Sequence, residues 1–289
     1  MIRFGPSGNS DIFYEQGYKS TVQMPKWLSE MGLNAFEYSF GRGVRLKQDL
    51  GRRIGLEADR YDIRLSVHMP YFINLTADEE EKRQKNFGYF LDSLRAAKAL
   101  GATRAVFHPG STGENRRDSL VNAQSLLMRI IAAVDEAGYG DIALCPETMG
   151  KLNQLGSLEE IIELCSLDDR LIPTIDFGHL HSRSLGGIKT KQDYAAILDA
   201  LENGIGKERA DKIHVHYSRI EFTKGGEKRH HRIVDEQYGP EFEPLAQLFF
   251  ERDMEPTVIC ESRGTMAEDA KTMLEMYLAA KTGQKNLVE

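Results

Sequence analysis

Short runs of β-branched and aromatic residues recur along the chain at fairly even intervals, and each is followed by a segment with helical periodicity. In one such segment, the apolar residues Leu126, Leu127, Ile130, Ile131 and Val134 share a helical face. Because strands that alternate with helices pair in parallel, the pattern predicts an α/β fold. We predict strands at residues 2–5, 35–40, 64–71, 104–108, 142–147, 171–177, 212–217 and 257–262.

Eight strand–helix units in 289 residues match the number and length at which a parallel sheet closes into a (β/α)8 TIM barrel. An open, doubly wound sheet is the alternative, but no GxGxxG motif follows the first predicted strand. No linker rich in proline, glycine or serine divides the chain. We therefore predict a single barrel domain over residues 1–289, in which 280–289 form a frayed tail.

Two kinds of signal predict where helices begin and end. Ser157 with Glu160, and Thr76 with Glu79, have the spacing of a capping box at a helix N-terminus. Gly101 follows a helical run, where a residue that tolerates positive φ is expected.

Composition limits the location and partners of the protein. No apolar run is long enough to span a membrane, and the N-terminus lacks the features of a signal peptide, so we expect a cytoplasmic protein. Cys145, Cys165 and Cys260 lack CxxC spacing and predict buried thiols rather than disulfides or a cysteine zinc site. A net charge of −7 disfavours a generic nucleic-acid binder, yet it leaves room for a local basic groove or bound cations. No obligate protein partner is expected.

Histidines and carboxylates gather at predicted strand ends, and none of the histidines lies in a predicted helix. Because the carboxyl ends of barrel strands meet at one rim, we expect these side chains to converge there. A mixed set of imidazole and carboxylate groups suits zinc, manganese or iron. Taken singly, each histidine is also compatible with a structural role, and each carboxylate with a helix cap. The residues are His68, His108, Glu147, Asp176, His179, His181, His214, His216, His230, His231 and Glu261.

Two of these histidines are weaker candidates. His216 shares a strand face with His214, so it either supports the site or lines the barrel wall. His181 is expected in an exposed loop. The segment GGEKRHHR at 225–232 is too polar to pack and is predicted to be a basic loop that carries His230 across the barrel mouth, with His231 directed to phosphate or solvent.

Seven short motifs, in order along essentially the whole chain, resemble the endonuclease IV family of abasic-site endonucleases, within the xylose-isomerase-like barrels. The motifs are SVHMPYFINL (66–75), FHPGS (107–111), PET (146–148), IDFGH (175–179), IH (213–214), RHH (229–231) and CES (260–262).

The resemblance implies a cluster of two or three divalent ions, Zn²⁺ first and Mn²⁺ or Fe²⁺ as alternatives. His68, His108 and Glu147 would hold the first ion. Glu147 would bridge to a second ion, which is completed by Asp176, His214 and Glu261.

The implied third ion is where the sequence departs from the family. His179 and His230 would hold it with an aspartate two residues before His230, but that position is Lys228. The span from His214 to His230 is also one residue longer than in the family. Either Glu227 replaces the aspartate, or the third site is weak or absent; Lys228 itself is a candidate to neutralise the leaving oxygen.

The expected activity is metal-dependent hydrolysis of double-stranded DNA at abasic sites, with Glu147 and Glu261 as the catalytic carboxylates. The resemblance implies DNA contacts from loops at the barrel mouth, and the alternative for the two aromatic residues is a cap on the barrel core. The alternative activity is that of a sugar isomerase or epimerase, which uses Glu147, Asp176, His214 and Glu261 around one ion. The candidate DNA-binding residues are Arg42, Arg45, Tyr71, Phe72, Lys228 and Arg229.

Overall fold

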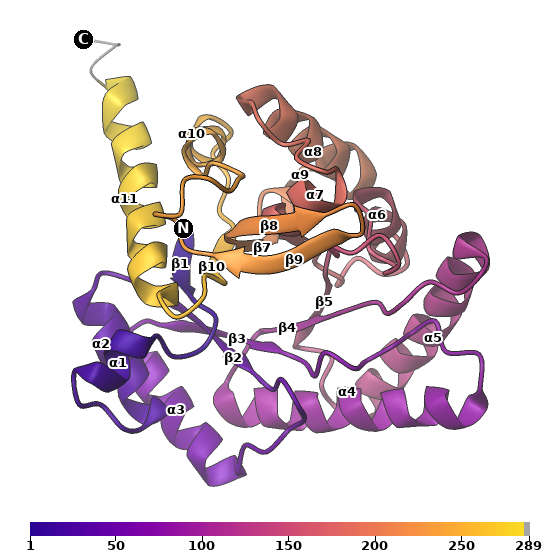
Figure 1. Ribbon diagram of the computed structural model, residues 1–289. Helices are drawn as coiled ribbons and strands as arrows, with labels where there is room; N and C mark the ends of the chain where they lie inside the picture. The colour runs from indigo at the N-terminus through magenta and orange to yellow at the C-terminus, as the bar shows by residue number, and fades with distance from the viewer. Residues whose placement is uncertain (286–289) are drawn as a thin grey trace.

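Eight parallel strands form a closed barrel in the computed structural model, which describes residues 1–285 (Figure 1). Two four-stranded sheets, in the orders β1-β10-β7-β6 and β2-β3-β4-β5, are joined by parallel bridges from Ser7 to Glu37 and from Glu147 to Thr174. The predicted TIM barrel is therefore confirmed, and the open sheet is excluded. The strands are β1 (Arg3–Pro6), β2 (Ala35–Ser39), β3 (Arg64–His68), β4 (Arg104–Phe107), β5 (Ala143–Pro146), β6 (Thr174–Asp176), β7 (His214–Tyr217) and β10 (Thr257–Cys260).

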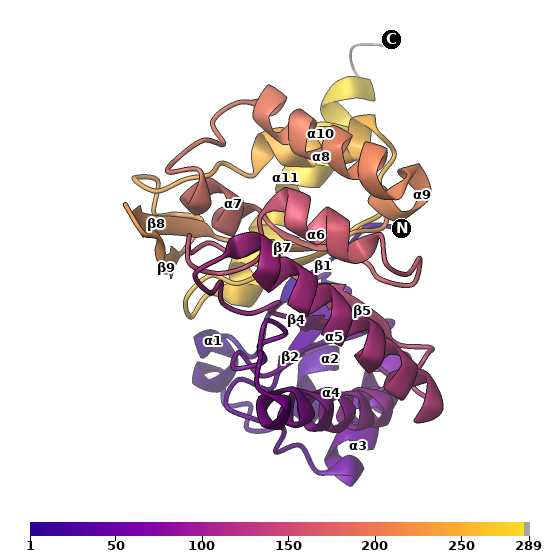
Figure 2. The ribbon, with the colours of Figure 1, turned by 90° about the vertical axis from the view of Figure 1, so that its right-hand side faces the viewer.

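Helices surround the barrel (Figures 1 and 2). Helix α11 continues to Lys285, so residues 280–285 of the expected frayed tail are helical, whereas 286–289 lie outside the described residues. Across residues 1–285, the structure has no helix with the length and apolar character needed to span a membrane. The helices are α1 (Asp11–Glu15), η1 (Thr21–Gln23), α2 (Met24–Glu30), α3 (Gln48–Arg60), α4 (Glu80–Leu100), α5 (Arg116–Glu136), α6 (Leu158–Cys165), α7 (Phe177–Arg183), α8 (Lys191–Ile205), α9 (Lys207–Ala210), α10 (Glu243–Glu251) and α11 (Met266–Lys285).

The sequence signals predict helix ends correctly where the capping side chain has no competing partner and can bond the helix backbone. Ser157 and Glu160 form a reciprocal capping box at the start of α6. Gly101 ends α4 with φ of 70°. The predicted cap at Thr76 is wrong. Its hydroxyl lies 2.7 Å from Oδ1 of Asn74 and 2.6 Å from the Ser111 carbonyl, both acceptors for its one hydrogen, and α4 begins only at Glu80.

An antiparallel hairpin follows β7, made of β8 (Arg219–Thr223) and β9 (Gly226–His231). The prediction of a loop over 225–232 is therefore wrong for most of that segment. Strand β9 could not be recognised from the sequence, because the side chains of this strand face polar groups rather than an apolar core. In Figure 2 the hairpin lies on the opposite side of the molecule from the N-terminus, beside the carboxyl ends of the barrel strands.

Backbone contacts dock this hairpin onto the loop after β5. The Glu227 amide donates to the Gly150 carbonyl at 3.2 Å, and the Leu152 amide donates to the Gly225 carbonyl at 3.2 Å. Gly226 has φ of +94°, and a Cβ there would lie 2.2 Å from the Gly150 oxygen. Only glycine fits this conformation and this close approach.

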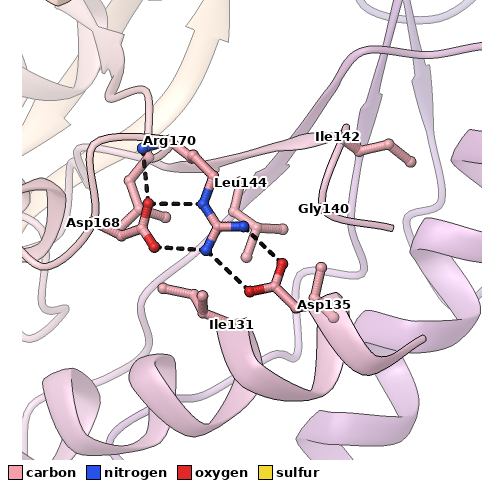
Figure 3. Close-up of a pocket in the computed structure, with 9 residues that line it drawn as sticks. Ile131, Asp135, Gly140, Ile142, Leu144, Asp168 and Arg170 are labelled. Atoms are coloured by element: carbon pink, nitrogen blue, oxygen red, sulfur yellow. Dashed lines mark hydrogen bonds and ion pairs between the residues drawn. The ribbon is translucent and has the colours of Figure 1, made fainter. Parts of the chain in front are cut away.

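At the other end of the barrel, Arg170 ties α5 to the segment after α6 beside a small cavity walled by Ile131, Ile142 and Leu144 (Figure 3). Its guanidinium donates to both oxygens of Asp135 and both of Asp168, at 2.6 to 3.1 Å. The guanidinium N–H groups that face these carboxylates all donate to them, so we interpret the cluster as structural. The three cysteines, Cys145, Cys165 and Cys260, are buried and free, as the sequence predicts.

Candidate metal centre

A cavity of about 330 Å³ opens at the carboxyl ends of the strands, within the range of small-molecule and cofactor sites. It is bordered by the loops after β2, β3, β5 and by the β8–β9 hairpin. The residues that line it are Ser39, Gly41, His68, Met69, Tyr71, His108, Glu147, Met149, Lys151, Gln154, His179, Glu227, His230 and Glu261.

The first group of potential ligands joins the ends of three neighbouring strands. His68 ends β3, His108 follows β4 and Glu147 follows β5. The Nε2 atoms of both histidines lie 3.1 Å from Oε2 of Glu147. Donors bound to one tetrahedral zinc lie roughly 3.3–3.6 Å apart, so a small adjustment around an ion would complete the coordination.

Glu147 connects this group to a second one. Its Oε2 faces His68 and His108, while its Oε1 lies 3.1 Å from Nδ1 of His216 and 3.4 Å from Nδ1 of His179. The side chain is fully buried, so each oxygen has a fixed direction. A carboxylate divided in this way would belong to two ligand groups at once.

The second group is Glu147, Asp176, His216 and Glu261, whose ligand atoms lie within 4.8 Å of one another. The sequence assigned His214 to this group, and the structure corrects that assignment. His214 lies one strand repeat deeper in the barrel, where its Nε2 bonds Glu37 at 2.9 Å. His216 takes the expected place because it stands two residues nearer the carboxyl end of β7.

Asp176 fits the second group because one of its oxygens is left without a partner. Oδ1 accepts a hydrogen bond of 2.7 Å from the His179 amide and caps helix α7. Oδ2 is buried and has no hydrogen-bond partner among residues 1–285. An orphaned buried carboxylate oxygen is costly unless it binds a cation, so the donor set fits a metal ion.

The third group contains His179, Glu227 and His230. Oε2 of Glu227 lies 3.5 Å from Nε2 of His179, and Oε1 lies 3.6 Å from Nε2 of His230. Glu227 thus faces both histidines, whereas the resemblance led us to expect an aspartate two residues before His230. Lys228 points elsewhere, because its ammonium is bonded to Glu221 on β8.

A β-bulge explains why the acidic ligand has moved by one residue. Arg229 pairs with Glu221 and Glu227 pairs with Phe222, so Lys228 is the extra residue on β9. In a regular strand, residues 227 and 230 would face opposite sides. The bulge resets the alternation and brings Glu227 and His230 to the same side.

Three histidines are held in the orientation that a ligand needs. Nδ1 of His68 and of His179 each lie 2.8 Å from a backbone carbonyl, and Nδ1 of His230 lies 2.8 Å from the Ser218 hydroxyl. In each ring, Nε2 is therefore directed to the cavity. Partners of this kind fix the tautomer and the direction of metal-binding histidines.

The packing of acid against imidazole shifts the pKa of both. Burial opposes the ionisation of Glu147, but the charges of His216 and His108 outweigh it and hold its pKa well below the usual value. Burial likewise opposes the charging of His68, yet Glu147 raises that pKa to about 9. For Glu227, the hydrogen bond to His230 and the charge of His179 outweigh burial and lower the pKa to about 2. Glu147 and Glu227 are ionised at neutral pH, the form that binds a cation.

Of the six candidate DNA-binding residues, Tyr71 is the one that lines the cavity itself. Tyr71 and Phe72 are 58% and 40% exposed, so they do not cap the barrel core. Arg42 and Arg45 lie in the loop after β2, and Arg229 is exposed on β9. No hydrogen bond or ion pair engages these three guanidinium groups within residues 1–285.

Two histidines lie outside the three groups. His181 was expected in an exposed loop, but it is buried in α7, with its ring 5.6 Å from that of Phe222. His231, which was expected to be directed to phosphate or solvent, stacks on Tyr238 at 3.8 Å and lies 3.4 Å from Glu221. Glu37, which reasoning from the sequence missed, lies inside the barrel beneath the second group. Its position at the centre of a predicted strand was the one available signal.

Comparison with known proteins places the chain among barrels of this type. Residues 25–279 match the family described as xylose isomerase-like TIM barrel. An uncharacterized protein of Methanocaldococcus jannaschii is 31% identical over 278 residues, which span 96% of this chain and 97% of that protein. A probable endonuclease 4 of Mycoplasmoides gallisepticum is 28% identical over 194 residues, 65% of this chain and 60% of that relative.

Solved structures share the fold at low sequence identity. A D-tagatose 3-epimerase-like protein superposes with a TM-score of 0.74 and 23% identity, covering 98% of this chain and 99% of its own. Endonuclease IV from Thermus thermophilus superposes with a TM-score of 0.67 and 20% identity, covering 97% and 99%. The chain belongs to the xylose isomerase-like TIM barrel family, and proteins named probable endonuclease 4 are among its relatives.

Proposed function

We propose that the protein is a metal-dependent phosphodiesterase that incises double-stranded DNA at abasic sites. The observation that carries the proposal is the presence of three contiguous ligand groups, of which the third contains His179, Glu227 and His230. A one-metal isomerase needs only the second group. The extra histidines therefore favour a reaction that distributes charge over several ions, as phosphodiester cleavage does.

In the proposed site, each group holds one divalent ion, with zinc as the first choice for this nitrogen and oxygen donor set. Bound ions would supply a lowered pKa for water and charge neutralisation on the phosphate. The chain itself fixes the positions of the donors. Glu147 spans the first two groups, and Glu227 completes the third.

Glu147 and Glu261 are the proposed catalytic carboxylates. Glu261 keeps 18% of its side chain exposed and lines the cavity, so it can contact a water molecule and the substrate there. Glu147 also borders the cavity but is fully buried. We assign Glu261 to orient the attacking water for in-line approach to phosphorus. Glu147 keeps the first and second ligand groups in fixed positions relative to each other.

The rim supports a nucleic-acid substrate. Tyr71 and Phe72 offer exposed aromatic faces beside the cavity, and such faces stack on unpaired or flipped bases. Arg42, Arg45 and Arg229 are free to neutralise DNA phosphates. Lys228 remains part of this proposed surface, although Glu221 already offsets its charge.

Epimerisation of a ketose is the second candidate, and a specific observation favours it. The second group, Glu147, Asp176, His216 and Glu261, forms a complete four-ligand site without the others. Carboxylates beside a single ion can exchange a proton next to a carbonyl. The fold of a D-tagatose 3-epimerase-like protein also superposes over nearly the whole chain.

The two candidates are separated by offering both substrates to the zinc-loaded protein. One sample receives an oligonucleotide duplex with a single abasic site, and the other receives a free ketohexose. We expect a nick at the lesion, no nick in the matched intact duplex and no epimer. Conversion of the ketohexose without any nick would reject the nuclease.

Variants connect the nick to the site. Glu147→Gln removes the charged bridge and is expected to reduce nicking at least about 100-fold, because ions and phosphate lose their common anchor. His231→Gln is the matched control, since His231 packs on Tyr238 outside the three groups and should leave the rate within about twofold.

A further inference from the structure

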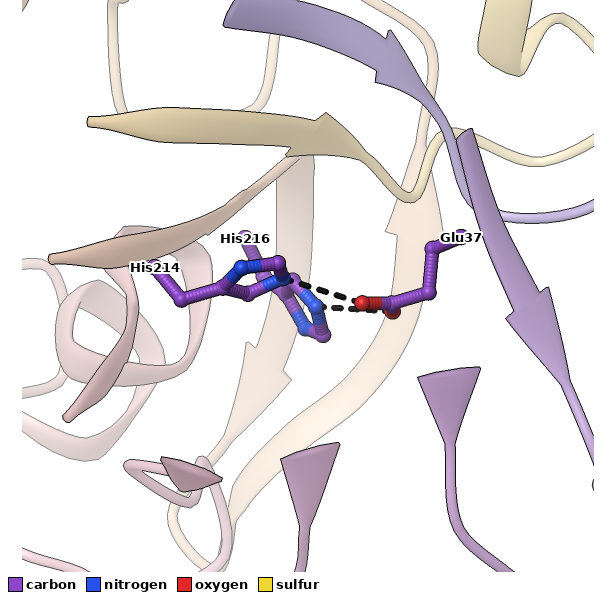
Figure 4. Close-up of side chains that lie close together, drawn as sticks. All are labelled: Glu37, His214 and His216. Carbon is purple, nitrogen blue, oxygen red and sulfur yellow. Dashed lines mark hydrogen bonds and ion pairs between the residues drawn. The ribbon is translucent and has the colours of Figure 1, made fainter. Parts of the chain in front are cut away.

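Beneath the second ligand group, the barrel interior contains charged and polar side chains where barrels usually contain Val, Ile and Leu. The carboxylate of Glu37 on β2 faces the rings of both His214 and His216 on β7, and all three residues are completely buried (Figure 4). Below them, Arg104 reaches from β4 and donates to the carbonyls of Lys212 and Ile213. Buried charges are costly unless they are paired, so this arrangement requires a physical reason.

The neighbours of His214 define its tautomer. Arg104 has only donors, and its Nη1 lies 3.5 Å from Nδ1 of His214. Nδ1 is therefore the acceptor, and Nε2 carries the proton, which it donates to Oε2 of Glu37 at 2.9 Å. The Ser66 hydroxyl donates to the same oxygen at 2.8 Å. These two donors fix the carboxylate and leave Oε1 for another partner.

The nearest polar group to Oε1 is His216. Its Nε2 lies 2.9 Å from Oε1 of Glu37 as an ion-pair contact, and neither atom has a hydrogen-bond partner within residues 1–285. The opposite ring nitrogen, Nδ1, lies 3.1 Å from Glu147 and 3.6 Å from Glu261. His216 is thus reversed relative to His68, His179 and His230, in which Nδ1 is held and Nε2 faces the cavity.

We propose that Glu37 is a positioning residue for the second metal group: it holds the Nε2–H of His216, so that Nδ1 is the donor to the ion. The inference rests on the proposed function, because it assumes that this group binds a metal. A carboxylate is a stronger acceptor than the carbonyls and the hydroxyl that hold the other three rings. Glu37 therefore makes His216 the more basic ligand and strengthens binding of the second ion.

Glu37, His214 and His216 also satisfy the distance criterion for a metal site of their own. Two features argue against that use. The donors already contact one another at 2.9 Å, and all three side chains have no exposed surface, which leaves no route for an ion. Ser66 donates to Oε2 of Glu37, and Nη1 of Arg104 lies 3.5 Å from Nδ1 of His214, so these two atoms are already engaged.

The test is Glu37→Gln, which keeps the shape of the side chain and removes its charge. Zinc affinity is measured by competition with a chromophoric chelator, on protein whose fold is verified by circular dichroism. We expect one ion to bind about 10–100-fold more weakly, with the affinities of the other ions unchanged. The matched control is Glu221→Gln, which removes a carboxylate from His231 outside the three groups and should change no affinity.

A second measurement stands even if Glu37→Gln does not fold. Long-range ¹H–¹⁵N spectra of zinc-loaded wild-type protein, with His216 assigned by substitution, report which ring nitrogen carries the proton. We expect the proton on Nε2 and the metal on Nδ1, and the reverse arrangement would overturn the inference. Wild-type affinity in Glu37→Gln would also overturn it, whereas a wild-type protein that binds no divalent ion would defeat the proposed function instead.

Discussion

Glu147 is the residue on which the proposed centre depends. Its two oxygens face different histidines, His68 and His108 on one side and His216 on the other, all at 3.1 Å. A single carboxylate in this position makes the first two groups one unit. Loss of the whole carboxylate would therefore affect both groups, unlike loss of a ligand at the edge of the cluster.

The role of Glu227 leads to a prediction about metal content. Glu227→Ala should lower the number of bound zinc ions by one, because His179 and His230 alone supply too few donors for a stable site. Lys228→Ala should retain every ion, since the Lys228 ammonium is bonded to Glu221. Metal content per chain, measured by inductively coupled plasma mass spectrometry, checks both; equal losses in the two variants would contradict the assignment.

The sequence identifies most of these ligands but cannot rank neighbours on one strand. His214 and His216 lie on the same face of β7, two residues apart, and no feature of the sequence says which one reaches the rim. The answer depends on where the strand ends relative to its neighbours, here with His216 beside Asp176 of β6. Glu37 was missed for a related reason, because only the closed barrel brings β2 opposite β7.

The β8–β9 hairpin is the element that completes the third group. Gly226 lets the hairpin approach Gly150 closely, and the bulge at Lys228 turns Glu227 toward the cavity. The sequence showed polar residues and glycines, which favour a loop. It could not show that the segment pairs with residues 219–223, since that pairing depends on the register and on docking against the loop after β5.

A charge-preserving exchange tests the bulge. In Glu227→Lys/Lys228→Glu, net charge is unchanged, but the new carboxylate occupies the position whose side chain contacts Glu221. We expect one zinc ion fewer per chain, with the first two ions retained. Full metal content in the exchanged protein would show that the strand register is not fixed as described.

Arg170, at the end of the barrel opposite the ligand groups, leads to a prediction about stability. Arg170→Gln removes bonds to Asp135 and Asp168 and should lower the free energy of unfolding by about 1 kcal/mol, at the upper end for exposed ion pairs because each contact is bidentate. Chemical denaturation measures it. Metal content should not change, and a loss of bound zinc would contradict the purely structural role of this cluster.

In the molecule as a whole, an acidic chain exposes arginines that have no partner in its described part. The net charge is −7, yet Arg42 and Arg45, in the loop after β2, and Arg229, on β9, are exposed and have no partner in residues 1–285. Composition alone therefore argued weakly against DNA, and the placement of charges argues for it. The barrel itself was predictable from its eight strand–helix units, because the alternation of strands and helices follows from the local spacing of apolar residues.

This placement predicts how DNA affinity depends on salt. Arg229→Ala should weaken binding to duplex DNA uniformly across sequences and reduce the slope of log K against log salt concentration by about 1. Fluorescence anisotropy over a salt series measures both quantities. Arg53→Ala, in helix α3 on the outside of the barrel, is the matched control, and an equal effect there would indicate general electrostatics rather than a binding rim.

The most direct test of the central claim counts metal ions and measures incision in the same preparation. Zinc per chain is determined before and after treatment with a chelator, and each sample is given a duplex with one abasic site. We predict three ions per chain and a nick at the lesion that is lost with the chelator and restored by zinc. One ion per chain, no nick under any condition and turnover of a ketose would contradict the account.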